Sequence, residues 1–433
     1  MKKPSIVVPP KACGDCRDCS NHCRKSLPIP LDEAFDKLFQ TVRLKPATND
    51  VPLELAAGKI TARKHCSAIT TPNCNVAMKD GIAVNWQEIG GEEDAEFQPF
   101  ATSAYSVVPM GAPVPDGYDT LLHAEQCRNT KGGMLILERP IPGQCISYAG
   151  SALEEDEEII PAGVRLRPEH LMMLRMGGVE MASVFKKPRV AVIPTGQDLV
   201  PGGVTPPYGK KIESVGIYAK TVAEQYGAHA VLYAPTGDDA RELGQILQYA
   251  AECYDVIAVI GGVGKGRSAY NDYTVSAVET VGTVVQHGVL VHPGGSPSLL
   301  AKVGGKPVLG IPGPPHAAVI IAELLLGGTL DRYYGGRYFQ RPKVCATLMA
   351  DYQPRRNTDW YVRVHVRRTG KGLAAFPVTS MGDTVDNLAM ANGILKVGPG
   401  LEYQQGCEAT VELLTADGLW DNENTACLGG SGE

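Results

Sequence analysis

Residues 255–266 read DVIAVIGGVGKG, an apolar run that leads directly into a glycine-rich loop. Its apolar residues are continuous rather than alternating with polar ones, which is typical of a strand buried on both faces of a sheet. The same order, an apolar run followed by glycine or proline, recurs in RVAVIPTG (189–196) and KPVLGIPG (306–313). These segments predict buried strands of one sheet.

Segments with helical character lie between these strands. SVGIYAKTVAEQYG (214–227) ends in a helix-stopping glycine, and DDARELGQILQYAAECY (238–254) begins with aspartates suited to a helix start. Helices are also expected around 271–282 and over 314–328, and a further strand over 229–237. This alternation predicts a mostly parallel sheet with helices on both faces. Ligands of such sheets bind outside the carboxyl ends of the strands, here the loops PTGQD, TGDD, GGVGKGRS and PGPP.

The pattern changes on both sides of this region. Short apolar runs separated by glycine and proline turns suggest β structure in the first third of the chain and again after the α/β region. We therefore expect a multi-domain α/β plus β protein. Its predicted parts are a Cys-rich arm (1–30), a linking helical and β region (31–50 and 146–187), a small β domain (51–145), an α/β domain (188–335) and a C-terminal β domain (340–425).

The composition is that of a soluble globular protein. The chain has 433 residues, of which 44% are hydrophobic and 20% charged, and a net charge of −6. No apolar run approaches the roughly 20 residues that span a membrane, and the N-terminus lacks a signal-peptide core. We expect a cytoplasmic protein without a membrane partner. The negative net charge argues against nucleic acid as the main partner.

Two glycine-rich loops and three aspartates are the candidate ligand-binding features of the sheet and the first β region. IGGVGKGRSAYNDY (260–273) and HPGGSPSLL (292–300) can bring backbone N–H groups close to a phosphate. Neither matches the P-loop or the dinucleotide fingerprint, and structural turns are the alternative. Carboxylates near a phosphate often hold Mg²⁺, and Asp80, Asp198 and Asp272 are the candidates, with turn or cap residues as the alternative.

Four cysteines near the N-terminus follow the spacing C-x2-C-x2-C-x3-C. This spacing occurs in bacterial [4Fe–4S] ferredoxins, although arginine rather than proline follows the last cysteine here. Zinc is the competing metal, and unused or redox-active thiols are the third possibility. Disulfides are disfavoured in a reducing compartment. The candidate ligands of a cluster or zinc ion are Cys13, Cys16, Cys19 and Cys23.

Six segments resemble the molybdopterin molybdenumtransferase family, which includes bacterial MoeA and the E domain of gephyrin. In the first half of the chain they are LELAAGKITARKHCSAITTPNCNVAMKDGIAV (53–84), MGAPVPDGYDTLLHAEQC (110–127) and AGSALEEDEEIIPAGVRLRPEHLMMLRMGG (149–178). In the α/β region they are RVAVIPTGQDLV (189–200), DVIAVIGGVGKG (255–266) and VLGIPGPPHAA (308–318). They occur in the family's order, and the chain is identified on them as a divergent member with an added Cys-rich arm.

The resemblance implies a three-layer α/β/α molybdopterin-binding domain, a small β domain and a C-terminal β-barrel, in a chain that forms a homodimer. It also implies a transferase that binds adenylylated molybdopterin and inserts molybdate, or tungstate, with release of AMP and help from Mg²⁺. Asp80, Asp198 and Asp272 would be the acidic catalytic residues. The implied cofactor-binding residues are Thr195, Gly196, Ser214, Gly261, Gly262, Gly264, Lys265, His292, Pro293, Gly294, Ser296, Pro312, Gly313 and Pro314.

The sequence departs from the family pattern around the expected molybdate site. Gly264 stands in place of a serine, and His292 in place of a lysine. A desolvated dianion needs cations or several N–H and O–H donors. Lys265, Arg267, His292 and His316 are the residues from which such a site could be rebuilt. The alternative function is a cofactor carrier or maturation factor with reduced catalysis, whose iron–sulfur or zinc arm docks to or senses a client molybdoenzyme.

Overall fold

The computed structural model describes residues 27–89, 99–264, 273–336, 341–353, 358–378 and 382–414. The Cys-rich arm that precedes residue 27, together with Lys265 and Asp272, lies outside these ranges. The chain divides into two compact units. One comprises residues 1–46 and 187–433, and the other residues 47–186. Within the described ranges, no helix combines the length and apolar character needed to cross a membrane.

The first unit contains the predicted α/β sheet. Four of its strands run parallel, β15 (His229–Leu232), β12 (Arg189–Pro194), β16 (Val256–Ile260) and β20 (Lys306–Ile311), in that order across the sheet. An antiparallel pair, β19 (Leu299–Val303) and β17 (Gly282–His287), extends it beyond β20. The strands predicted at 189–196, 255–266 and 306–313 are confirmed, and they lie side by side.

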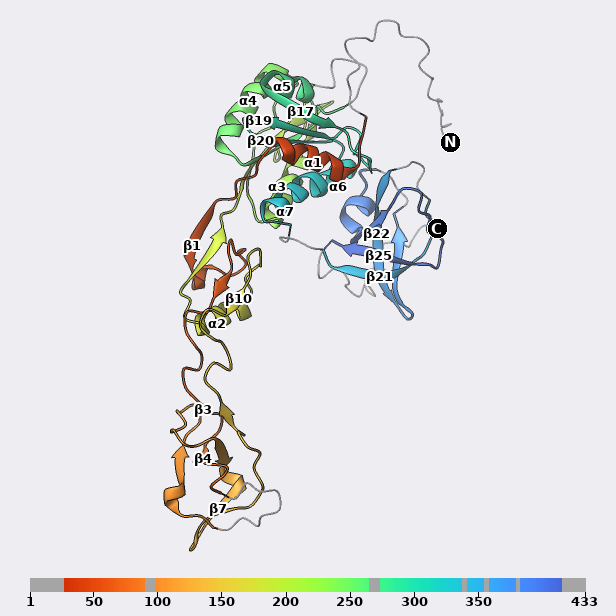
Figure 1. Cartoon of the computed structure of the whole chain (residues 1–433). Coiled ribbons are helices and arrows are strands. Elements are labelled where there is room, and N and C mark those ends of the chain that lie inside the picture. The colour runs from red at the N-terminus through yellow and green to blue at the C-terminus, as the bar shows by residue number, and fades with distance from the viewer. Residues whose placement is uncertain are drawn as a thin grey trace. The chain divides into compact units, whose positions relative to one another are not determined.

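Helices cover both faces of this sheet, as the continuous apolar strands require (Figure 1). One layer consists of α4 (Ala240–Cys253) and α5 (Tyr273–Val281), whose side chains pack against Ile193 and Ile257. The opposite layer packs against residues such as Val192 and Ile260. It consists of α1 (Leu31–Thr41), α3 (Val215–Gln225), α6 (Pro315–Ile321), the π-helical turn Ala322–Gly327 and α7 (Gly328–Tyr333). The three-layer expectation is therefore confirmed.

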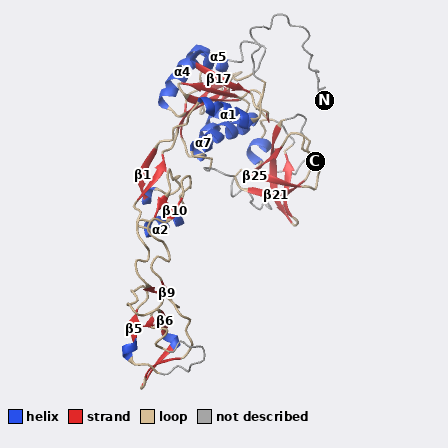
Figure 2. Ribbon diagram, viewed as in Figure 1, coloured by secondary structure: helices blue, strands red, loops and turns tan. Residues whose placement is uncertain are grey.

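The C-terminal part of the same unit is a closed five-stranded β-barrel (Figure 2). In β22 (Asp359–Thr369) inward side chains alternate with outward ones, so that Trp360, Val362, Val364 and Val366 enter the barrel core. The other barrel strands are β23 (Gly372–Pro377), β21 (Lys343–Leu348), β25 (Glu408–Leu413) and β24 (Gly393–Val397), and a π-helical turn spans Asp386–Met390. A short strand from the α/β part, β18 (Val291–His292), pairs in parallel with the start of β22.

The second unit, residues 47–186, is built from short strands around small apolar cores. One core gathers Leu53, Ile160, Leu166, Leu174 and Val184. Around it lie β1 (Thr48–Pro52), β2 (His65–Cys66), β10 (Glu158–Ile160), α2 (Pro168–Met176) and β11 (Met181–Phe185). The remaining strands of the unit are β3 (Val76–Ala77), β4 (Gly81–Val84), β5 (Tyr105–Val108), β6 (Thr120–His123), β7 (Cys127–Thr130), β8 (Gly133–Ile136) and β9 (Ile146–Ser147).

Within the first unit, a two-stranded ribbon of β13 (Leu199–Val200) and β14 (Lys211–Ile212) follows β12.

Candidate functional site

The carboxyl ends of the parallel strands bring most of the predicted phosphate-binding residues together. Thr195 directly follows β12 and donates its backbone N–H to the Ile260 carbonyl at 2.8 Å. Gly261 follows β16 and donates to the Ile311 carbonyl at 2.9 Å. A Cβ on Gly261, whose φ is +95°, would lie 2.5 Å from the Thr195 carbonyl oxygen. The close approach of these loops therefore requires glycine at this position.

The neighbouring predicted residues lie at the same edge. Gly262 has a φ of +63°, and Gly313 lies near the Cα of Gly261. A Cβ on Gly216 would lie 2.9 Å from Cγ of Pro194, so the start of α3 adjoins the end of β12. Ser214 immediately precedes this helix. The edge thus combines glycine backbone, which lets an anionic group approach the N–H groups closely, with the start of α3, where the Glu213 carboxylate accepts a hydrogen bond from the Gly216 N–H. The remaining predicted positions at this edge are Gly196, Gly264, Pro312 and Pro314.

Two residues of this edge were not among the sequence-derived candidates. Asp238 accepts a hydrogen bond from the Gln197 backbone N–H at 3.0 Å. The Tyr273 hydroxyl interacts with the side chains of Thr195 and Asp238. Burial first, and then the Asp238 carboxylate, raise the pKa of Tyr273, which therefore serves as a neutral hydroxyl. Asp238 could have been identified from the sequence, because it lies in the strand-end loop TGDD. No local sequence pattern indicated that Tyr273 belongs to the site.

Asp198 and Asp80 have protein partners of their own. The Asp198 carboxylate forms an ion pair with Lys211 at 2.9 Å. Hydrogen bonding to Lys211 lowers the pKa of Asp198, so it is ionised at neutral pH. Asp80 accepts a hydrogen bond from the Met110 backbone N–H at 2.8 Å and belongs to the other unit of the chain. Within the described ranges, no three His, Cys, Asp or Glu residues gather as a metal site would require.

A second group of predicted residues lies where the α/β part meets the barrel. The pairing of β18 with β22 places the His292 ring over Trp360, with ring centroids 4.0 Å apart. Gly294 packs on α6, since a Cβ there would lie 2.9 Å from Cβ of Ala317. His292 and Pro293 line a cavity of about 460 Å³. Ser296 of the same loop is exposed.

Nitrogen-bearing side chains of the barrel line this cavity. Trp360 and Arg363 line it together with His316 and Asn387. Within the described residues, the buried Trp360 Nε1 and Arg363 Nε have no hydrogen-bond acceptor. Burial lowers the pKa of Arg363, but a guanidinium remains charged in proteins. A cavity lined by a fixed cation and by histidine and asparagine side chains is suited to a small oxyanion.

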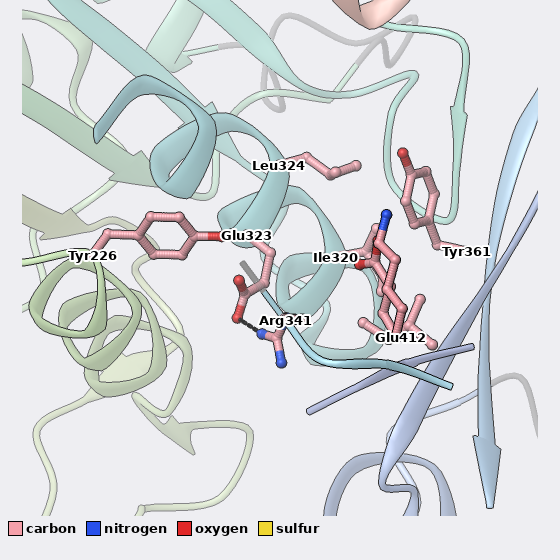
Figure 3. A pocket seen from close by; sticks show the side chains of 9 residues that line it. Tyr226, Ile320, Glu323, Leu324, Arg341, Tyr361 and Glu412 are labelled. Carbon is pink, nitrogen blue, oxygen red and sulfur yellow. Dashed lines mark hydrogen bonds and ion pairs between the residues drawn. The ribbon is translucent and has the colours of Figure 1, made fainter. Parts of the chain in front are cut away.

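A buried ion pair lies in a second pocket of the same unit, which Figure 3 shows from close by. Arg341, which precedes β21, donates to Glu323 of the π-helical turn at 2.5 Å, and the two side chains are only 9% and 10% exposed. The Tyr218 hydroxyl donates to the same Glu323 oxygen at 3.2 Å. Ile320 and Tyr361 line both the cavity beside this pair and the oxyanion-sized one. The pair therefore sets the distance between α6 and the barrel.

The structure is that of a multi-domain protein with a three-layer α/β/α domain and a β-barrel. Residues 29–178 match the family model described as "MoeA N-terminal region (domain I and II)". Residues 191–332 match the model described as "Probable molybdopterin binding domain". The chain belongs to the MoeA family.

Curated relatives and solved structures agree with this family. A molybdopterin molybdenumtransferase of Staphylococcus aureus is 26% identical over 369 residues, which cover 82% of this chain and 87% of the relative. A Haemophilus influenzae protein of the same name is 24% identical over 326 residues, covering 72% and 80%. The crystal structure of a Pyrococcus horikoshii MoeA protein covers 90% of this chain and all of its own, with a TM-score of 0.74 and 24% identity. This likeness confirms the fold.

Proposed function

We propose that this protein is a molybdopterin molybdenumtransferase of molybdenum, or tungsten, cofactor biosynthesis. Its substrates are adenylylated molybdopterin and molybdate or tungstate, and AMP leaves when the metal is inserted. One observation carries the proposal. In a single compact unit, a glycine-rich strand edge suited to a phosphate accompanies a cavity lined by Arg363 and two histidines, His292 and His316, that is suited to an oxyanion.

The strand edge would hold the phosphate-containing part of the pterin nucleotide. Glycines at 261 and 262 let the ligand approach the backbone closely. The neutral hydroxyl of Tyr273 and the hydroxyl of Thr195 can orient phosphate oxygens by hydrogen bonding. This set explains recognition of a phosphate without the lysine of a P-loop.

The barrel-side cavity would hold the metal oxyanion. Molybdate is a tetrahedral dianion, and its desolvation must be offset by charge-assisted hydrogen bonds. Among the barrel residues that line the cavity, Arg363 supplies a permanent cation and Asn387 a side-chain amide. These barrel residues compensate for the lysine that the sequence lacks at His292.

The described residues do not by themselves form a Mg²⁺ site. Asp198 is paired with Lys211, and Asp238 is bound to the backbone of Gln197. We therefore derive no step through Mg²⁺, and a role for Asp272 in holding it stays a prediction. A homodimer, in which Asp80 of a second copy would contribute to the cleft, is a further proposal that light scattering can test.

The decisive experiment is a single-turnover assay with adenylylated molybdopterin, Mg²⁺ and molybdate. The proposal expects one AMP per pterin nucleotide, and R363M should abolish AMP release while the nucleotide still binds. R367M is the matched control, because Arg367 lies on the outward face of the same strand and is exposed. If the wild-type protein binds the nucleotide but leaves it intact, the transferase proposal fails. The cofactor-carrier alternative would then account for the binding.

A further inference from the structure

The start of α6 and the barrel domain are joined by a histidine–carboxylate pair. Asp383 Oδ1 accepts one hydrogen bond from the His316 backbone N–H at 2.8 Å and another from His316 Nδ1 at 2.9 Å. His316 also lines the 460 Å³ cavity, together with Arg363. The pair therefore fixes the position of an imidazole ring at the wall of the candidate oxyanion site.

The contact with Asp383 decides which ring nitrogen can change its protonation. An ionised carboxylate only accepts hydrogen bonds, so the proton of Nδ1 stays between His316 and Asp383. Nε2 is then the nitrogen that gains or loses a proton. A neutral ring presents a lone pair at Nε2, which repels an oxyanion oxygen, whereas a protonated ring presents an N–H donor.

The charge of the pair follows the same proton. With a neutral ring, His316 and Asp383 together carry −1, and with a protonated ring they carry zero. The other titratable or charged groups that line the cavity are His292, Asp351, Tyr352, Tyr361 and Arg363. The state of His316 therefore changes the charge of the cavity lining by one unit, and the protonated ring favours a dianion.

We propose that His316 is an oxyanion-binding residue that takes up a proton when the dianionic substrate, molybdate or tungstate, enters this cavity. Asp383 is its positioning residue. The inference takes the identity of the substrate from the proposed function. It adds His316 as a hydrogen-bond donor in a site where the lysine and the serine of the family pattern are replaced. It also makes the affinity for molybdate depend on pH.

The direction of this dependence follows from linkage. Histidine changes charge between about pH 5 and pH 8. Where the unliganded ring is neutral and the liganded ring is protonated, binding takes up one proton, and the dissociation constant rises up to about tenfold for each pH unit. Molybdate should therefore bind more weakly as the pH increases toward about 8.

Isothermal titration of the full chain with sodium molybdate tests the proposal. Titrations at several pH values, each in two buffers of different ionisation enthalpy and at constant ionic strength, give both the affinity and the number of protons taken up. At the highest pH values of the series, the wild-type protein should take up close to one proton for each molybdate bound. H316Q should bind without proton uptake, and its affinity should change less than about twofold per pH unit.

Two further variants separate binding from mere folding. D383N keeps an acceptor for Nδ1 but removes the negative charge that favours the protonated ring, so the pH range of tight binding should move to lower pH. H365Q is the matched control, because His365 pairs with Asp386 at 2.8 Å in the same barrel but does not line the cavity. It should bind molybdate like the wild type.

Two results would overturn the inference. One is a wild-type protein that binds no molybdate at any pH, and the other is proton uptake that persists unchanged in H316Q. Both are distinct from failure of the proposed function, which is judged by AMP release from the pterin nucleotide. A protein that releases AMP with a pH-independent molybdate affinity would keep the transferase function and exclude this role for His316.

Discussion

Replacing Arg341 by methionine removes one partner of the buried ion pair that joins α6 to the barrel. Glu323 would then keep the Tyr218 hydroxyl, at 3.2 Å, as its remaining donor to Oε1. Its second oxygen, Oε2, is buried and has no hydrogen-bond partner within the described residues. The substitution therefore leaves the Glu323 carboxylate, whose side chain is 10% exposed, without its ion-pair partner and with Arg363 as the cation that still acts on it.

The expected loss of stability is about 3 kcal/mol, the lower end of the range for breaking a buried ion pair. The lower end applies because Tyr218 still donates to Glu323. The neighbouring pair of Lys343 and Glu412, 3.3 Å apart, provides the control, since its side chains are 64% and 41% exposed. K343M should cost less than about 1 kcal/mol, as is usual for a surface pair.

Urea unfolding followed by the fluorescence of Trp360 measures this difference. The chain has three tryptophans, so a W86F/W420F background makes Trp360 the reporter of the barrel. R341M should shift the transition to lower urea with an unchanged slope, and molybdate affinity should fall with it because the cavity walls separate. An R341M loss no greater than that of K343M would refute the reasoning. The double variant E323Q/R341M should recover part of the loss, since no uncompensated charge remains.

Three other experiments have definite expected outcomes. G261A should weaken pterin-nucleotide binding and destabilise the fold by at least about 1–2 kcal/mol, since the new Cβ meets the Thr195 carbonyl at positive φ. G370A, in a barrel turn with open space around it, should change neither. Burial lowers the pKa of His65, whose Nε2 accepts from the Ser183 N–H at 3.1 Å. The neutral His65 ring contributes fully to the stability of the folded state above the ordinary histidine pKa of about 6.5. This stabilisation is lost as the pH falls through the lower pKa of the folded state. Urea unfolding of the 47–186 unit should show this acid destabilisation, and H65Q should abolish it. Anaerobic purification with metal analysis tests the four cysteines of the arm. About four irons and four sulfides per chain indicate an iron–sulfur cluster, and one zinc indicates a structural zinc site. If neither metal is found, the cysteines are thiols.

The sequence predicted the α/β part of the fold well because its signals are local. Continuous apolar runs identified β12, β16 and β20, and Asp239 was expected near the start of a helix that it does cap, accepting from the Arg241 N–H at 2.8 Å. The resemblance to the MoeA family added the barrel and the three-layer arrangement, and both are confirmed. The antiparallel pair of β17 and β19 was not predicted, although the two strands lie close together in the chain.

By itself, the sequence determined where strands end and glycine loops begin, because burial on both faces and backbone freedom leave direct marks on residue choice. It could not show that Arg363 and Trp360 would reach the loop at His292, since strand pairing of β18 with β22 joins segments some distance apart in the sequence. Nor could it show that Asp383 would fix the ring of His316. Those contacts arise only when the barrel packs on α6, and so the tertiary structure decided the chemistry of the cavity.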